Sequence, residues 1–333
     1  MARPDPAIVR VLREYKAALQ RREQDQMAEM ALRWLDVERA LAAQMELLAR
    51  DVADMRAAGH NITPDALREM QRYRDLLAQI RIEVARYTGY ADQTIIGETG
   101  RWVQLSIDAA IESINAGYQD ARMPVPNFTR LGTQAAENAI AWASKGAPLH
   151  ELLAASYPDA VQGITQELIN GTALGWNPVK TAAAMRNGSA LGLNRSLLIA
   201  RDQQMRAARA ATDEQYRVSG VVKGKIRLAA KDLRTCPACL ARDGEWLPLD
   251  DPGYDHPQGR CSFVPQLAGV PDPRWQTGAE WFETLDATTQ ERMLGNSLYQ
   301  AWKSGKTSFA NIAQTTEHDV WGAGLRIKKA SEL

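Results

Sequence analysis

The chain has 333 residues, 45% of them hydrophobic, and its 40 basic residues are balanced by 40 acidic ones. This predicts a soluble folded protein with two or three structural units, and zero net charge excludes an overall attraction to nucleic acid or acidic lipid. No apolar run of about eighteen residues is present and residues 1–6 precede no apolar segment, so we expect neither a membrane-spanning helix nor a signal peptide, and synthesis in a cytoplasm.

The first long segment is predicted to be a single helix. Residues 7–58 contain neither glycine nor proline, follow Pro6 and stop at Gly59, which suits a helix C-terminal cap. Its apolar residues recur mostly at spacings of three and four and form one stripe along the helix. The stripe consists of Ile8, Leu12, Tyr15, Leu19, Met27, Met30, Trp34, Leu41, Met45, Leu48, Val52 and Met55.

A second helix is expected to begin with Thr63 as N-cap and Pro64 in its first turn, and to end near Thr88, with Gly89 as its stop. The two helices then form a long hairpin whose seam is the apolar stripe. A second interpretation stays open. Because the first helix is predicted to be about twice as long as the second, part of its stripe is left uncovered as a surface for a partner.

From residue 91 to about residue 217 the pattern stays helical, but repeated glycine and proline predict a compact bundle of shorter pieces. The candidate helices are about 102–116, 133–144, 150–155, 159–170, 178–185 and 194–217. The pattern then changes to strands, with polar and apolar residues alternating over 221–228 and two further candidates at 245–247 and 262–264. After Pro273, short amphipathic helices are expected at about 278–285, 288–294, 297–304 and 308–313.

These patterns predict a mainly α protein: a long N-terminal helical hairpin, a helical bundle, and a small α+β C-terminal module, which the cysteines described next predict to be zinc-stapled. Four consecutive domains follow from the changes of pattern. They are a long helical hairpin arm over 1–90, a helical bundle over 91–218, a small sheet with the zinc site over 219–270, and a C-terminal helical wrap over 271–333.

The metal prediction rests on the three cysteines, Cys236, Cys239 and Cys261, and on His256, which falls between the last two. A Cys-x-x-Cys turn supplies two thiolates from one loop, and a histidine and a cysteine from a second loop can close a tetrahedron. We therefore predict a structural Zn²⁺ ion held by these four residues. Four protein ligands leave no open position for a substrate, so the metal is expected to hold the fold together, and no catalytic residue is predicted.

Other interpretations of the cysteines stay open. They could form a disulfide and a free thiol or a redox-active pair, or they could be unrelated small residues. An odd count and the lack of a predicted secretory segment argue against an oxidised framework. The fourth ligand is also open, because Asp255 precedes His256 directly and Asp232 lies shortly before Cys236.

Residues 195–234 hold the largest local surplus of charge, with ten basic side chains and four acidic ones. Basic side chains on one face can neutralise phosphates and produce salt-sensitive DNA binding. The candidates for nucleic-acid contact are Arg206, Arg209, Lys223 and Lys225. The alternative is a solvated face whose arginines pair with carboxylates elsewhere.

The motifs in the second part of the chain occur in a recognisable order. They are Ala200-Arg201-Asp202-Gln203, Thr235-Cys236-Pro237-Ala238-Cys239, Asp243-Gly244, His256-Pro257 through Arg260-Cys261, Gly295, Tyr299, Ala301-Trp302-Lys303 and Gly305. Taken together they resemble the phage Mu F-like, or minor head morphogenesis, family of tailed bacteriophages. The resemblance covers about residues 128–333 and leaves the N-terminal arm outside it.

Two motifs depart from the family pattern. Asp202-Gln203 stands where the family usually has Thr-Glu, and Gly259 stands where it has an earlier cysteine, so Cys261 is the one thiol of its loop. The resemblance implies a minor capsid protein of the virion, at the portal vertex or in the capsid interior, assembled in the host cytoplasm. It implies the portal protein as partner, with phage DNA and other capsid proteins as further partners and no membrane. The implied roles are head assembly, DNA packaging or retention, and DNA ejection.

Two other functions are compatible with the residues. A zinc-supported nuclease needs a further histidine to activate water, and Glu317-His318-Asp319 is the nearest candidate, although a surface polar cluster explains that triplet as well. A free-standing DNA-binding protein would use the basic segment and would lose affinity steeply with salt.

Overall fold

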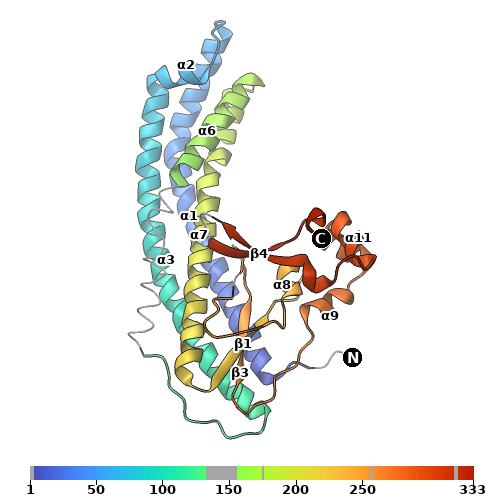
Figure 1. Ribbon diagram of the computed structural model, residues 1–333. Coiled ribbons are helices and arrows are strands. Elements are labelled where there is room, and N and C mark those ends of the chain that lie inside the picture. Colours follow the sequence, from blue (N-terminus) through green and yellow to red (C-terminus); the bar gives the residue numbers. More distant parts are fainter. Residues whose placement is uncertain (1–3, 133–155, 175, 254, 257–258, 319–321) are drawn as a thin grey trace. The chain divides into compact units, whose positions relative to one another are not determined.

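The computed structural model describes residues 4–132, 156–174, 176–253, 255–256, 259–318 and 322–333. The protein is mainly α, with 66% of its residues in helices and 9% in strands, as the sequence predicts (Figure 1). The described residues group into two compact units. Unit 1 comprises 1–21, 99–143 and 204–333, and unit 2 comprises 22–98 and 144–203. The four consecutive domains expected from the sequence stay a prediction.

The first helix is confirmed. Helix α1 runs over Ala7–Ala57 and is followed by Gly59 with φ 88°, a left-handed conformation that glycine adopts without strain. Helix α2, Pro64–Glu69, begins as expected with Thr63 as its N-cap, where the Thr63 Oγ1 accepts a hydrogen bond from the Ala66 N–H. It ends after six residues, because Met70 is extended, and helix α3 follows over Gln71–Asp120.

The expected stop at Gly89 is wrong, because α3 continues through it as far as Asp120. Glycine in a helix interior costs about 1 kcal/mol relative to alanine. Tyr87, Ala91 and Ile95, on either side of Gly89, are all buried, and burial of such side chains stabilises by more than this cost. Tertiary burial therefore overrides the local signal.

The later helices are also longer than the sequence indicates. Helix α6 covers Ser156–Ala173, and helix α7 covers Pro178–Ser219, which joins the two pieces expected at 178–185 and 194–217. The pieces expected at 133–144 and 150–155 lie outside the described residues. In unit 2, a Cβ atom at Gly188 of α7 would lie 2.5 Å from the Gly163 carbonyl oxygen of α6. Gly188 therefore permits close contact between two helix backbones.

Replacement by alanine is expected to have opposite effects on stability at Gly188, which contacts another helix, and at Gly97, which does not. Gly188→Ala should lower the free energy of unfolding by about 1 to 3 kcal/mol, because α6 and α7 must separate to admit the methyl group. Gly97→Ala is the matched control: Gly97 lies inside α3, an added Cβ meets nothing within 4 Å, and the change should stabilise by about 1 kcal/mol. Urea titrations followed by circular dichroism measure both. Equal effects would contradict this account of Gly188.

Unit 2 buries the apolar stripe of α1. Its core includes Met30, Trp34, Leu41, Met45, Leu48 and Val52 of that helix. The Trp34 and Tyr87 rings meet edge to face with their centroids 4.8 Å apart, and Arg201 of α7 forms an ion pair with the buried Glu23 of α1. The expectation of a partly uncovered stripe is wrong: α1 and α3 have nearly equal lengths, and these six stripe residues are all buried.

Unit 1 contains a three-stranded antiparallel sheet in the order β2-β1-β3. Strand β1 is Val222–Leu228, β2 is Trp246–Leu247 and β3 is Ser262–Leu267, close to the three predicted strands. Ile226 pairs with Trp246 on one side and Val264 on the other. The sheet shares a core with the first turns of α1, through Ile8, and with Tyr216 at the end of α7.

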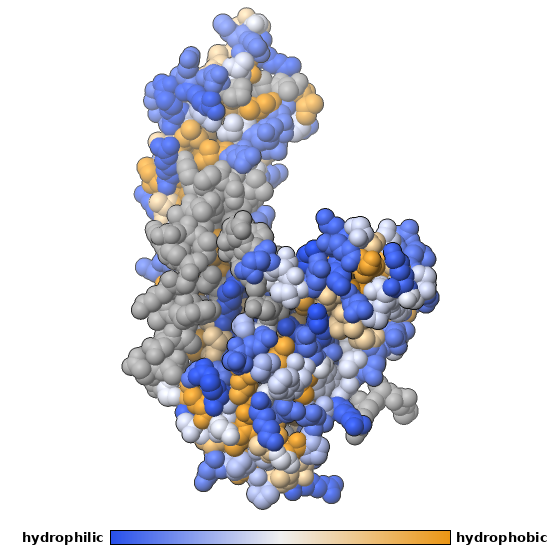
Figure 2. Space-filling view, in the orientation of Figure 1, coloured by the Kyte–Doolittle hydropathy of each residue, from blue (hydrophilic) through white to orange (hydrophobic). Residues whose placement is uncertain are grey.

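The C-terminal part of unit 1 contains three short helices, α9 (Gly278–Glu283), α10 (Ala287–Leu294) and α11 (Asn296–Lys303), and the 3-10 turns η1 (Phe309–Ile312) and η2 (Ala330–Glu332). The three α-helices agree with those expected at about 278–285, 288–294 and 297–304, whereas the helix expected at about 308–313 is the 3-10 turn η1 followed by a strand. A hairpin of β4 (Ala313–His318) and β5 (Gly322–Ile327) was not predicted. None of the helices in the described part of the chain has the length and hydrophobicity of a membrane span. Figure 2 shows hydrophilic side chains spread over the face in view.

Candidate metal centre

The first pair of candidate ligands lies on a tight turn after β1. Cys236 precedes the short helix α8, Pro237–Ala241, and Pro237 begins that helix, where its missing N–H is not needed. Cys239 lies inside α8 and is buried, while Cys236 is half-buried. Before the turn, the Asp232 carboxylate accepts hydrogen bonds from the Arg234 N–H and the Thr235 hydroxyl. These hydrogen bonds of Asp232 fix the conformation of the residues that lead into Cys236.

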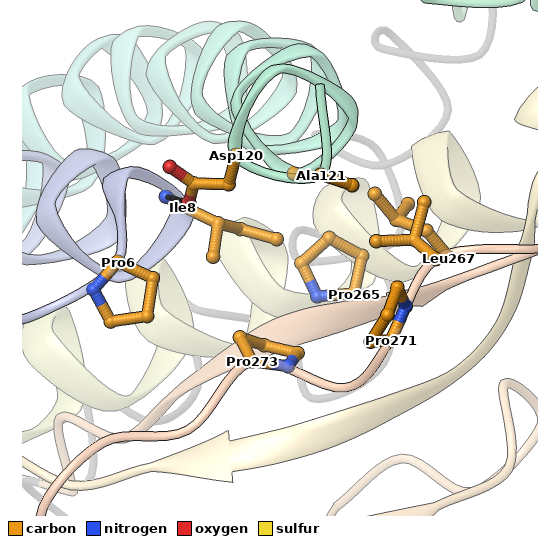
Figure 3. A pocket seen from close by; sticks show the side chains of 10 residues that line it. Pro6, Ile8, Asp120, Ala121, Pro265, Leu267, Pro271 and Pro273 are labelled. Carbon is orange, nitrogen blue, oxygen red and sulfur yellow. Dashed lines mark hydrogen bonds between the residues drawn. The ribbon is translucent and has the colours of Figure 1, made fainter. Parts of the chain in front are cut away.

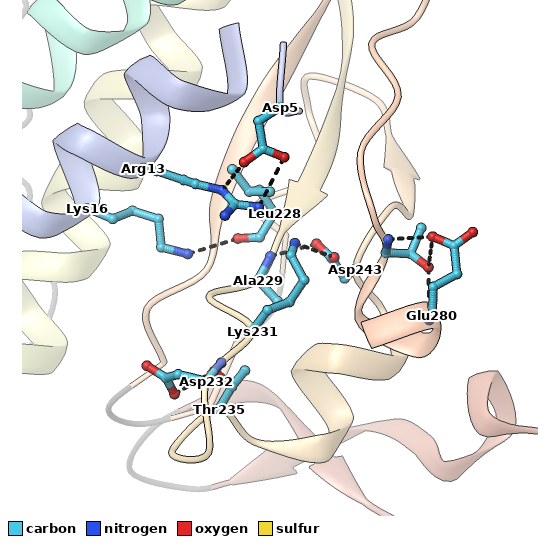
Figure 4. A network of polar contacts seen from close by, with 11 residues as sticks. Asp5, Arg13, Lys16, Leu228, Ala229, Lys231, Asp232, Thr235, Asp243 and Glu280 are labelled. Carbon is cyan, nitrogen blue, oxygen red and sulfur yellow. Dashed lines mark hydrogen bonds and ion pairs between the residues drawn. The ribbon is translucent and has the colours of Figure 1, made fainter. Parts of the chain in front are cut away.

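The Asp243-Gly244 motif anchors this turn. The buried Asp243 carboxylate accepts a hydrogen bond from the Ala229 N–H at 2.7 Å and pairs with the Lys231 ammonium at 3.0 Å (Figure 4). Gly244 has φ 89°, so the chain can reverse directly after Asp243 and enter β2. The same figure shows the Lys16 ammonium of α1 donating to the Leu228 carbonyl at the end of β1.

The second pair of ligands comes from the loop before β3. Sulfur and nitrogen atoms of Cys236, Cys239 and His256 lie within 4.8 Å of one another. The same limit holds for Cys239, Asp255 and Cys261, so Cys239 belongs to both groups. The structure thus brings all four predicted ligands to one place, where they could hold a metal ion. It also distinguishes between the two carboxylates that the sequence offered as alternative fourth ligands, because Asp255 lies in the group and Asp232 does not.

Hydrogen bonds among the three sulfurs lower the pKa of two of them and raise that of the third. A hydrogen bond with Cys239, together with one from His256, lowers the pKa of Cys236 to about 4 against the effect of burial. Cys239 shares hydrogen bonds with both other cysteines, which raises its own pKa and lowers that of Cys261. Cys236 is therefore stabilised as a thiolate, the species that binds metal ions, and the pKa of Cys261 is shifted in the same direction.

Buried positive charge surrounds the cluster. Burial opposes the charge of Arg227 on β1, but Cys261, Asp255 and Cys239 outweigh it and hold its pKa above the ordinary value. Burial likewise opposes ionisation of Asp255, yet Arg209 and His256 keep the pKa of that carboxyl low. Three thiolates with one divalent cation carry a net negative charge, and burying a net charge is costly unless it is compensated. The surrounding cations fit such a centre.

The C-terminal motif residues lie in the same core as the cysteines. Cys239 and Cys261 belong to one hydrophobic cluster with Tyr299 of α11, and Trp302 packs against it. The Trp302 ring meets the Phe282 ring edge to face, with centroids 5.3 Å apart. Gly295 and Gly305, on either side of α11, both have φ 75°, which glycine adopts freely. Tyr299 and Trp302 thus belong to the hydrophobic core that also contains two of the candidate ligands.

The four residues predicted to contact nucleic acid do not form one exposed surface. Lys225 is fully buried and its ammonium pairs with Asp213 at 2.7 Å, so it is not available to DNA. Arg209 is also occupied, because it pairs with the buried Asp255. Lys223 is exposed and Arg206 is half-buried. The prediction is therefore corrected for Lys225 and Arg209, whose charges are neutralised within the fold, and for Arg206 and Lys223 it stays a prediction.

Two other features bear on chemistry. His318 ends β4, and its side chain lies outside the described part. A pocket of about 170 Å³ in unit 1 is lined mainly by prolines and aliphatic side chains (Figure 3). Its one carboxylate, Asp120, accepts a hydrogen bond from the Ile8 N–H at the start of α1, so it serves to cap that helix. The chain matches no protein-family model, no curated protein and no solved structure.

Proposed function

We propose that this protein is a minor head protein of a tailed bacteriophage, bound at the portal vertex or inside the capsid, where it acts in head assembly, DNA packaging or retention, or ejection. In this proposal the protein is not an enzyme, and a structural Zn²⁺ ion held by Cys236, Cys239, His256 and Cys261 stabilises its C-terminal module. The portal protein is its direct partner.

One observation carries the proposal. The motifs that resemble the phage family are far apart in the sequence, yet the Cys-x-x-Cys turn lies beside His256 and Cys261, and Cys239 and Cys261 share a hydrophobic cluster with Tyr299. This grouping of the cysteine motif, the histidine motif and Tyr299 supports a resemblance in architecture as well as in residue types.

The donor set supports zinc in particular. Three sulfurs and one imidazole form a closed tetrahedral set, which zinc prefers in structural sites, whereas magnesium and calcium require oxygen ligands. We expect purified protein to contain one zinc per chain by elemental analysis. Its zinc affinity should fall as the pH is lowered, because protons compete for the thiolates. A purified protein that is folded and free of metal would contradict the zinc proposal.

The partner is tested by co-purification with the portal protein. A tagged copy of the full chain, expressed with the portal protein of the same phage, should retain the portal protein through size-exclusion chromatography. Removal of residues 1–90 is a poor test, because Ile8, Val9 and Leu12 belong to the core of unit 1. The double variant Leu32→Glu and Leu35→Glu is a better probe of α1, since these side chains are 64% and 40% exposed.

The controls separate the outcomes. The major capsid protein alone, expressed with the tagged chain, should be retained less than the portal protein. If the portal protein is not retained and the protein is missing from purified heads, the proposal is wrong. Salt-sensitive binding of free DNA by the purified chain, without portal binding, would instead favour the DNA-binding alternative.

A further inference from the structure

Arg209 of α7 contacts the loop that carries two of the metal ligands. Its guanidinium donates to three acceptors of that loop: the Asp255 carboxylate at 2.5 Å, the Gly259 carbonyl at 2.9 Å and the Cys261 carbonyl at 3.4 Å. The side chain is only 15% exposed. A planar group with several fixed donors can hold three acceptors at once, which a single ammonium cannot do.

Asp255 is the centre of these contacts. Besides Arg209, its carboxylate accepts hydrogen bonds from the His256 N–H at 2.9 Å and the Cys261 N–H at 3.3 Å. Its backbone carbonyl accepts a further hydrogen bond from the Leu325 N–H of β5 at 3.2 Å. Asp255 thus connects helix α7, the ligand loop and the C-terminal hairpin.

Gly259 leaves the space that this arrangement needs. A Cβ atom at position 259 would lie 2.0 Å from the Asp255 carboxyl carbon, so the carboxylate occupies the volume that any side chain there would fill. The loop therefore closes around a buried carboxylate, and its carbonyls at 259 and 261 turn toward Arg209.

We infer that Arg209 is a positioning residue of the metal centre, acting through Asp255 to hold the ligand loop so that His256 and Cys261 face the Cys236 turn. The inference rests on the proposed metal binding. Groups that orient metal ligands reduce the ordering that binding must otherwise impose, and their loss typically weakens metal affinity by about 10- to 100-fold. Arg209 touches the carboxylate and carbonyls of the loop and binds no metal itself.

The test compares metal affinity in variants of the full chain. Arg209→Gln should weaken Zn²⁺ binding by about 10- to 100-fold, measured by competition with a chromophoric chelator. It should also change the visible absorption spectrum of the Co²⁺-substituted protein, which reports the geometry of the ligands. Arg217→Gln is the matched control: it lies on the same helix with a 61% exposed side chain that pairs with Glu214, and it should leave both measurements unchanged.

A second variant keeps the test decisive if the Arg209→Gln protein does not fold. Arg209→Lys keeps the positive charge beside Asp255 but reaches fewer acceptors, and it should still lower Zn²⁺ affinity and alter the Co²⁺ spectrum. Unchanged affinity and spectrum in the folded Arg209 variants would overturn the inference, even if their thermal stability fell. If the wild-type protein itself binds neither Zn²⁺ nor Co²⁺, the zinc proposal fails first, and the inference fails with it.

Discussion

Replacing Cys239 with serine is expected to abolish stoichiometric metal binding and to unfold the region of about residues 220–265. Cys239 belongs to both groups of candidate ligands, so its loss removes a donor that neither group can replace. The binding free energy of a structural zinc ion is folding free energy, on the order of 10 to 16 kcal/mol in zinc-finger peptides. Because Cys239 also lies in the cluster with Tyr299, the disorder should extend to α11.

Hydrogen exchange measured by mass spectrometry locates this effect. Peptides from residues 220–265 and from α11 should exchange much faster in Cys239→Ser than in the wild type, while peptides from unit 2 keep their protection. Arg234→Lys is the control, because its side chain is 64% exposed and lies two residues before Cys236. A Cys239→Ser protein with wild-type protection and one bound metal would show that Cys239 is not a ligand.

The second large effect is expected at Lys225. Its ammonium is fully buried between Asp213, 2.7 Å away, and the Phe263 ring, 4.5 Å from its centroid. Burial lowers the pKa of Lys225 and raises the pKa of Asp213 to about 6, while the facing charges act against both shifts. Lys225→Met should lower the free energy of unfolding by about 3 to 5 kcal/mol, because Asp213 then remains buried without its partner.

Chemical denaturation of four proteins tests this account. Lys223→Met, two residues earlier on the same strand and exposed, should change stability by less than about 0.5 kcal/mol. The double variant Lys225→Met and Asp213→Leu should regain most of the loss, since an apolar pair of similar volume replaces a buried ion pair at little cost. If Lys225→Met behaves like Lys223→Met, Lys225 is accessible to solvent, and its place among the DNA-contact candidates is restored.

Local signals in the sequence predict most element starts correctly. Pro6 and Gly59 bound α1, Thr63 caps α2, and the alternation over 221–228 matches β1. Each of these features depends on a few neighbouring residues, and caps and turns have strong residue preferences. Glycine within a segment is ambiguous by comparison. Gly89 and Gly188 indicate breaks in the sequence, but both lie inside helices that tertiary contacts maintain.

The sequence predicts the four candidate metal ligands but not the residues that position them. The spacing of Cys236, Cys239, His256 and Cys261 identifies four donors, because metal ligands are few in kind and occur in short pairs. Only the tertiary structure shows that Asp255 lies at this cluster and Asp232 does not. The same holds for the roles of Arg209 and Lys225, because a basic residue looks the same in a sequence whether it faces solvent or a buried carboxylate.

Residue type and spacing alone were sufficient to establish a mainly helical chain, a long uninterrupted first helix and one cluster of metal-binding donors. The folded chain decided which glycines lie within helices, that the stripe of α1 is buried, and which charges are neutralised internally. The physical reason is the distance along the sequence over which each kind of interaction acts. Caps, turns and ligand pairs act over a few residues, whereas burial and ion pairing depend on segments such as α7 and the 255–261 loop, which meet only after folding.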